Sequence, residues 1–81
     1  MTRFFFHLRD GNDQVLLDPE GVELADMEAM KRCAMQAARG VMAGDLSNGV
    51  LDLRYRIDVE NAAHEMIYTL AFRHAVSVID A

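Results

Sequence analysis

Apolar and charged side chains alternate strictly along one segment in the second half of the chain, and this pattern constrains the fold more than any other. The apolar positions are Leu51, Leu53, Tyr55, Ile57 and Val59, and the charged positions between them are Asp52, Arg54, Arg56 and Asp58. Successive side chains of a β-strand point to opposite faces of a sheet. Residues 51–59 are therefore predicted to form a strand with one buried face and one solvated face, whose charges pair across strands.

Three further segments have the composition of strands. Residues 3–9 contain three consecutive phenylalanines, residues 15–17 are aliphatic, and residues 66–72 place apolar side chains at alternate positions. Asp10-Gly11-Asn12-Asp13 has the chemistry of a turn, since Gly and Asn accept positive φ, so the first two strands are predicted to form a hairpin. Residues 60–64 form the loop before the last strand.

A single amphipathic helix is predicted over residues 27–44. Asp26 is a favourable N-cap, and one side of the helix carries an apolar stripe rich in alanine, which allows close packing on a sheet. Asp18-Pro19-Glu20-Gly21 before it has the residue order of a type I turn, and residues 45–49 end the helix with an Asn-Gly turn signal.

These segments predict one α+β domain over residues 1–81, in which one helix covers one face of an antiparallel sheet of about four strands. The order is strand, strand, helix, strand, strand and a C-terminal tail. The tail, residues 73–81, fits a short helix by its apolar spacing, although its β-branched residues favour an extended chain.

The first strand divides its side chains between two faces. Phe4, Phe6 and Leu8 share the face predicted to contact the helix. The opposite face carries Arg3, Phe5, His7 and Arg9. An aromatic ring on the open side of a sheet favours a contact surface for a partner, so these residues are the candidate interaction surface. The alternative is that the C-terminal tail folds back over Phe5.

No catalytic, cofactor-binding or metal-binding site is predicted. The three histidines and the single cysteine, Cys33, lack the short spacing of zinc ligands, and the acidic segment after Asp10 fails the calcium-loop template at its glycine and glutamate positions. No nucleophile signature or phosphate-binding glycine loop is present. Cys33 lies beside the apolar stripe of the helix and is expected to pack as a small apolar residue. The chain is therefore not expected to be an enzyme.

The net charge of −5 disfavours nucleic acid as a partner, because phosphate recognition depends on a basic excess. The alternative of a weak nucleic-acid binder would use the aromatic strand face with Arg3, Arg9, Arg54 and Arg56. No run approaches the ~18 apolar residues of a membrane span and the first residues lack a signal-peptide core, so a cytoplasmic protein without membrane contact is expected.

At 81 residues the core is small, and one cysteine allows no internal disulfide. Self-association commonly supplements such a core, so a homodimer is expected. Together these observations favour a small non-catalytic protein-interaction or regulatory module that acts as a dimer with an unknown protein partner.

The segments "RFFFHLRDG", "LLDPEGVEL", "ADMEAMKRCAMQAARGVMAGDLSNG", "LDL", "RIDV" and "LAFRHAV" follow one another in an order that resembles a family of short bacterial proteins with the pattern "YFFHLRDG…D.EG.EL". That family is an uncharacterised domain of unknown function, so the resemblance implies the segment layout and a bacterial origin but no activity. Relatives tend to have a glycine turn where this chain has Glu60-Asn61-Ala62-Ala63-His64. The layout is also similar to HicB-type antitoxin domains, which implies, by fold analogy alone, an acidic module that binds a basic protein.

Overall fold

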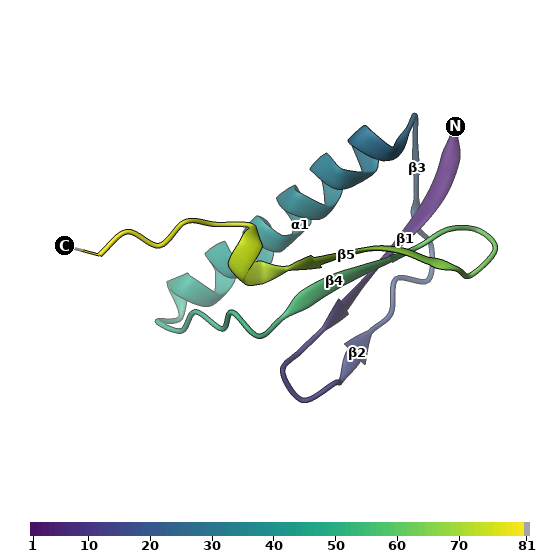
Figure 1. Ribbon diagram of the computed structural model, residues 1–81. Helices are drawn as coiled ribbons and strands as arrows, with labels where there is room; N and C mark the ends of the chain where they lie inside the picture. Colours follow the sequence, from purple (N-terminus) through teal and green to yellow (C-terminus); the bar gives the residue numbers. More distant parts are fainter. Residues whose placement is uncertain (81) are drawn as a thin grey trace.

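In the computed structural model, which describes residues 1–80, one long helix covers one face of an antiparallel sheet (Figure 1). The elements in chain order are β1 (Thr2–Arg9), β2 (Val15–Leu16), β3 (Val22–Leu24), α1 (Met27–Ser47), β4 (Arg56–Glu60), β5 (Met66–Ala71) and the short 3₁₀ helix η1 (Phe72–His74). The α+β class and the one-helix arrangement are confirmed. The sheet has five strands rather than about four, because the segment predicted only to lead into the helix forms β3.

β1 is the central strand of this sheet. Along one side it pairs with β4, which places Phe6 opposite Val59 and Leu8 opposite Ile57. Along the other side it pairs with β3 near its start and with β2 near its end. β5 lies beyond β4 and forms the outer edge of the sheet.

The core lies between α1 and the sheet face of β1, β4 and β5. The helix contributes Met30, Ala34, Ala38 and Met42, all buried, and its alanines let the backbone approach the strands closely. Phe4 is buried against them, and Phe6 and Leu8 pack at the border of the core, as the alternation of β1 predicts. Phe72 is completely buried, and its ring stacks on Tyr55 with 5.4 Å between the ring centres.

β4 begins five residues later than the alternating pattern predicts. The Asp52 carboxylate accepts the backbone N–H of Arg54 at 2.9 Å and also binds the Arg54 guanidinium. This local bond turns the chain and competes with strand pairing, so only Arg56–Glu60 joins the sheet. The periodicity of residues 51–55 reflects partial burial rather than an extended strand.

The helix begins as predicted and ends later. The carboxylate of Asp26 accepts the backbone N–H of Ala29 at 2.8 Å, which is the N-cap bond of α1. Gly44 does not stop the helix, which continues to Ser47. The chain leaves the helical conformation at Gly49, whose φ of +84° is in the left-handed region that glycine adopts most easily.

The predicted turn between β1 and β2 is built by its first aspartate. Oδ1 of Asp10 accepts the backbone N–H groups of Asn12 at 2.8 Å and Gln14 at 2.9 Å. The positive φ, expected at Gly11 or Asn12, is instead found at Asp13, where it is 63°. The side-chain bonds of Asp10 place the tight bend two residues later than the glycine suggests.

The loop between β4 and β5 repeats this construction. Oδ1 of Asn61 accepts the backbone N–H groups of Ala63 and Glu65, both at 3.0 Å, and His64 takes the left-handed conformation with φ 62°. Both hairpins are therefore closed by an Asp or Asn side chain followed three residues later by a left-handed residue.

The tail is helical only at its start. Phe72–His74 forms the 3₁₀ turn η1, after which Ala75 is buried in the core and Val76 packs against it. Residues 77–80 then extend away from the sheet without regular structure (Figure 1). The last residue of the predicted tail, Ala81, lies outside the described residues.

Candidate functional site

The face of the sheet turned away from α1 carries the predicted interaction surface and a network of polar side chains. The register between β1 and β4 places His7 opposite Asp58 and Arg9 opposite Arg56 on this face. Arg3, Phe5, His7 and Arg9 share it, as the alternation predicts. We refer to this side of the sheet as the open face.

Asp18 closes a gap in the edge of β1. β3 pairs with β1 at residues 2–4 and β2 pairs at residues 8–9, so the amide of Phe6 has no strand beside it. Oδ2 of Asp18 accepts this amide at 3.1 Å, and Oδ1 accepts the amides of Glu20 at 3.3 Å and Gly21 at 3.1 Å. Burial raises the pKa of Asp18, but these backbone hydrogen bonds outweigh it and hold the pKa below the ordinary aspartate value.

Gly21 lets the same loop lie directly on β1. Its φ is +70°, and a Cβ atom at this position would lie 2.7 Å from the carbonyl oxygen of Phe4 and 2.9 Å from the ring of Phe5. Only glycine fits this approach without a shift of the backbone. The ring of Phe5 is half-buried and lies against this loop, and the end of the tail leads away from the sheet (Figure 1).

His7 joins the loop to β4. The backbone N–H of Asp18 donates to Nδ1 of His7 at 3.0 Å, so Nδ1 carries no proton and the ring proton is on Nε2. Nε2 then donates to Oε1 of Glu60 at 2.5 Å. The His7 side chain is only 9% exposed, and both of its nitrogens are occupied within the chain.

Asp58 is the centre of a second buried cluster on the open face. Its carboxylate accepts hydrogen bonds from Nε of Arg9 at 3.2 Å, Nε of Arg56 at 3.0 Å and the hydroxyl of Thr69 at 3.1 Å. Burial raises its pKa, and the bonds from Arg56, Arg9 and Thr69 outweigh burial and lower it overall. Asp58 was predicted on a solvated face; it is 3% exposed because the two arginine side chains cover it.

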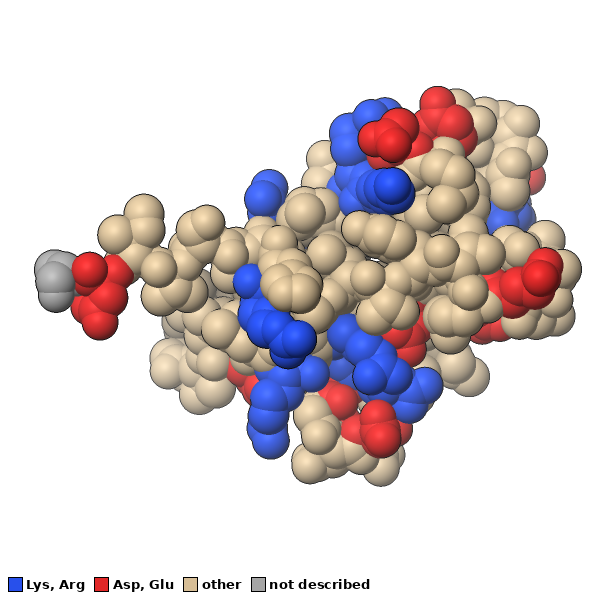
Figure 2. Space-filling model, in the orientation of Figure 1, with Lys and Arg blue, Asp and Glu red and all other residues tan. Residues whose placement is uncertain are grey.

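The basic groups of the predicted surface are all engaged with acidic or carbonyl oxygens. Arg3 donates to the carbonyl of Glu20 at 2.6 Å and to the carboxylate of Glu23 at 3.3 Å, and Arg9 lies 3.7 Å from the carboxylate of Asp13. In Figure 2, basic side chains occur in separate groups with acidic side chains at their borders. The face in view is not a continuous basic surface.

The remaining candidate ligands and nucleophiles lie apart. His7 is in β1, His64 in a hairpin turn and His74 in η1, and within residues 1–80 no three His, Cys, Asp or Glu side chains are placed to share a metal ion. Cys33 is half-buried on α1. Burial, together with the negative charge of Asp18, raises the pKa of its thiol, so the reactive thiolate is disfavoured.

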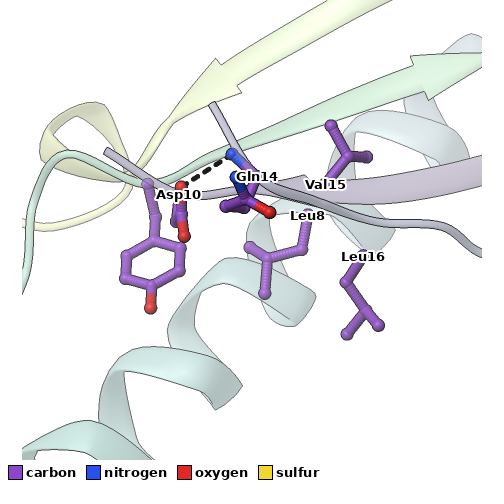
Figure 3. A pocket seen from close by; sticks show the side chains of 6 residues that line it. Leu8, Asp10, Gln14, Val15 and Leu16 are labelled. Atoms are coloured by element: carbon purple, nitrogen blue, oxygen red, sulfur yellow. Dashed lines mark hydrogen bonds between the residues drawn. The ribbon is translucent and has the colours of Figure 1, made fainter. Parts of the chain in front are cut away.

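Two shallow hollows lie at opposite ends of the sheet. The hollow of about 260 Å³ has an apolar floor beside the β1–β2 hairpin, and Figure 3 shows the Asp10 carboxylate at its rim bound to the amide of Gln14. Its lining residues are Leu8, Asp10, Gln14, Val15, Leu16 and Tyr55. The other, of about 430 Å³, lies between the start of α1 and the β4–β5 hairpin and is lined by Thr2, Phe4, Asp26, Met27, Asn61 and Ile67. Neither gathers a set of converging catalytic groups.

Three acidic residues of the open-face network, Asp18, Asp58 and Glu60, were not identified as site residues from the sequence. Asp58 occurs within the alternating segment, where its charge indicated a solvated position. The residue type of Asp18 predicts a turn, whereas its bond to Phe6 joins residues distant in sequence. The signal that could have linked Asp58 to the network is the alternation of polar residues in both β1 and β4, which places His7 opposite Asp58 when the two strands pair.

A comparison with protein families matches residues 3–73 to a domain of unknown function, DUF6894. No curated protein and no solved structure matches the chain. Within residues 1–80, no helix combines the length and the apolar character that crossing a membrane requires.

Proposed function

Since the chain belongs to the DUF6894 family, whose function is unknown, we propose from its own structure that it is a small non-catalytic interaction module that acts as a dimer in the cytoplasm. One observation carries the proposal: among the described residues, more large apolar side chains are exposed than are fully buried. The exposed ones include Leu16, Leu17, Leu46, Val50, Val78 and Ile79. Such groups favour association when they can be covered by a partner.

Sedimentation velocity of the full chain tests this proposal. Concentrations of about 1 to 100 μM cover the range in which weak dimers dissociate, which corresponds to a binding free energy of roughly −8 to −5 kcal/mol. We expect the weight-average mass to rise from that of one chain to that of two. A single chain at every concentration would contradict the dimer.

For a partner other than a second copy, the open face around Phe5 is the candidate surface. Phe5 offers a half-exposed ring, and Arg3, at 44% side-chain exposure, offers one side of its guanidinium, whereas His7 is used within the chain. Affinity purification from the native cell with the wild type and with Phe5→Ser would identify a protein that depends on this ring. Met66→Ser, an exposed apolar residue of β5, is the matched control.

The two alternatives gain no specific support. Arg3, Arg9, Arg54 and Arg56, which a nucleic-acid binder would use, each pair with a carboxylate. A titration with single-stranded oligonucleotides at ~50 mM salt would reveal salt-sensitive binding if they were available to phosphates. An antitoxin-like role, in which the acidic chain binds a basic protein, rests on layout alone.

A further inference from the structure

The outer edge of β5 is an unpaired strand edge. β5 is bonded to β4 on one side only, so alternate backbone N–H and C=O groups point outward without a strand partner. The pairing skips Ile67, since Val59 lies opposite Tyr68 and Glu60 opposite Met66. The regular part of the edge is therefore residues 68–71, and it contains no proline, glycine or charged residue that would block a further strand.

The segment after η1 also has unpaired backbone groups, so it can supply a strand to such an edge. Residues 76–80 make no backbone hydrogen bond within the described chain, and Val78 and Ile79 are 70% and 93% exposed. Nε of Arg39 donates to the carbonyl of Ala75 at 2.8 Å and ties the start of this segment to α1. The segment then leads away from its own β5 (Figure 1).

We propose that residues 77–80 of one copy pair antiparallel with residues 68–71 of β5 in a second copy, and the reverse, so that two chains exchange their C-terminal segments. This inference rests on the proposed function, because it names the contact surface of the dimer. An exchange of identical segments is reciprocal and closes at two copies.

The charges favour this register. When residues 77–80 of one copy lie antiparallel to residues 68–71 of the other, Asp80 lies opposite Tyr68 and Val78 lies opposite Leu70. The ammonium of Lys31 lies 5.8 Å from the centre of the Tyr68 ring, and its own partner, Glu28, is 4.0 Å away on an exposed helix turn. Lys31 is thus placed to pair with the incoming Asp80, once on each side of the two-fold axis.

Charge reversal tests the contact directly. We expect Lys31→Glu and Asp80→Lys each to raise the dimer dissociation constant about tenfold in sedimentation velocity, because two ion pairs per dimer become repulsive contacts. The double variant, Lys31→Glu with Asp80→Lys, should return the constant to within about threefold of the wild type. Arg32→Glu and Glu20→Lys, at other exposed positions, are the matched controls and should leave it unchanged.

Ile79→Pro removes a strand donor from a segment that makes no backbone bond in the single chain, so the fold is retained and the dimer should weaken more than tenfold. A wild-type chain that is monomeric at every concentration overturns the dimer of the proposed function and this contact with it. A wild-type dimer that Ile79→Pro leaves intact overturns only the segment exchange. Weakening by both single reversals without recovery in the double variant overturns the register.

Discussion

At the scale of single residues, the carboxylate of Asp18 accepts the backbone N–H of Phe6 at a point where no strand pairs with this edge of β1. Asp18 accepts three backbone N–H groups and also donates its own N–H to His7, so it joins the loop to β1, and His7 in turn bonds Glu60 of β4. A carboxylate is suited to this position because it offers several acceptor sites. The segment Asp18-Pro19-Glu20-Gly21 therefore bends the chain and also supplies a hydrogen bond that a neighbouring strand would otherwise make to β1.

We expect Asp18→Ala to lower the free energy of unfolding by about 2–3 kcal/mol, since the half-buried amide of Phe6 and the amides of Glu20 and Gly21 lose a charged acceptor. Urea unfolding followed by circular dichroism measures this change. Glu20→Ala, in the same loop but with an exposed side chain, should change stability by less than about 0.5 kcal/mol. Equal effects of the two substitutions would contradict the role given to Asp18.

At the scale of elements, two hairpins use one turn construction on different sequences. In each, a side-chain oxygen of Asp10 or Asn61 organises the turn and the third residue after it adopts positive φ. The family resemblance leads one to expect glycine in the second hairpin, and His64 takes the left-handed conformation there instead. In this chain, the turn is held by the hydrogen bonds that Asn61 accepts from Ala63 and Glu65.

His64→Gly should raise the free energy of unfolding by about 0.5–1 kcal/mol, because glycine adopts positive φ without the steric cost of a Cβ atom. The exposed pair of His64 with Glu60, 3.8 Å apart, contributes little that would be lost. Thermal unfolding compares this variant with Ala63→Gly, which changes a neighbouring residue without positive φ and should not stabilise. A stability gain in both variants would point to the loop as a whole and not to the backbone of His64.

At the scale of the whole molecule, the sheet carries a polar network on its open face in addition to the apolar core beneath α1. Asp18 and Asp58 both have lowered pKa values in the folded chain. A carboxyl group with a lowered folded pKa stabilises the fold fully above its unfolded pKa of about 3.9. That contribution is lost as the pH falls through the folded pKa.

Unfolding in urea at pH 7, 4 and 2.5 should therefore show a steep loss of stability below roughly pH 4. Asp58→Asn should be less stable than the wild type at pH 7, because Arg9 and Arg56 lose their anionic partner, and its stability should fall less steeply with acid. Parallel pH curves for the two proteins would show that Asp58 is not a source of the acid sensitivity.

The sequence alone determined the properties that depend on local chemistry and periodicity. These are the α+β class, the helix with its Asp26 cap, the division of β1 into two faces and the position of the turns, since each follows from neighbouring residues. Only the tertiary structure decided that β4 starts at Arg56, that Val22–Leu24 joins the sheet as β3, and that Asp58 is buried. The strand β3 and the burial of Asp58 depend on contacts between distant parts of the chain, such as β3 with β1 and Arg9 with Asp58, which the register of the sheet brings together. The start of β4 depends on the balance between this long-range pairing and the local bond of Asp52 with Arg54, which the alternating pattern does not reveal.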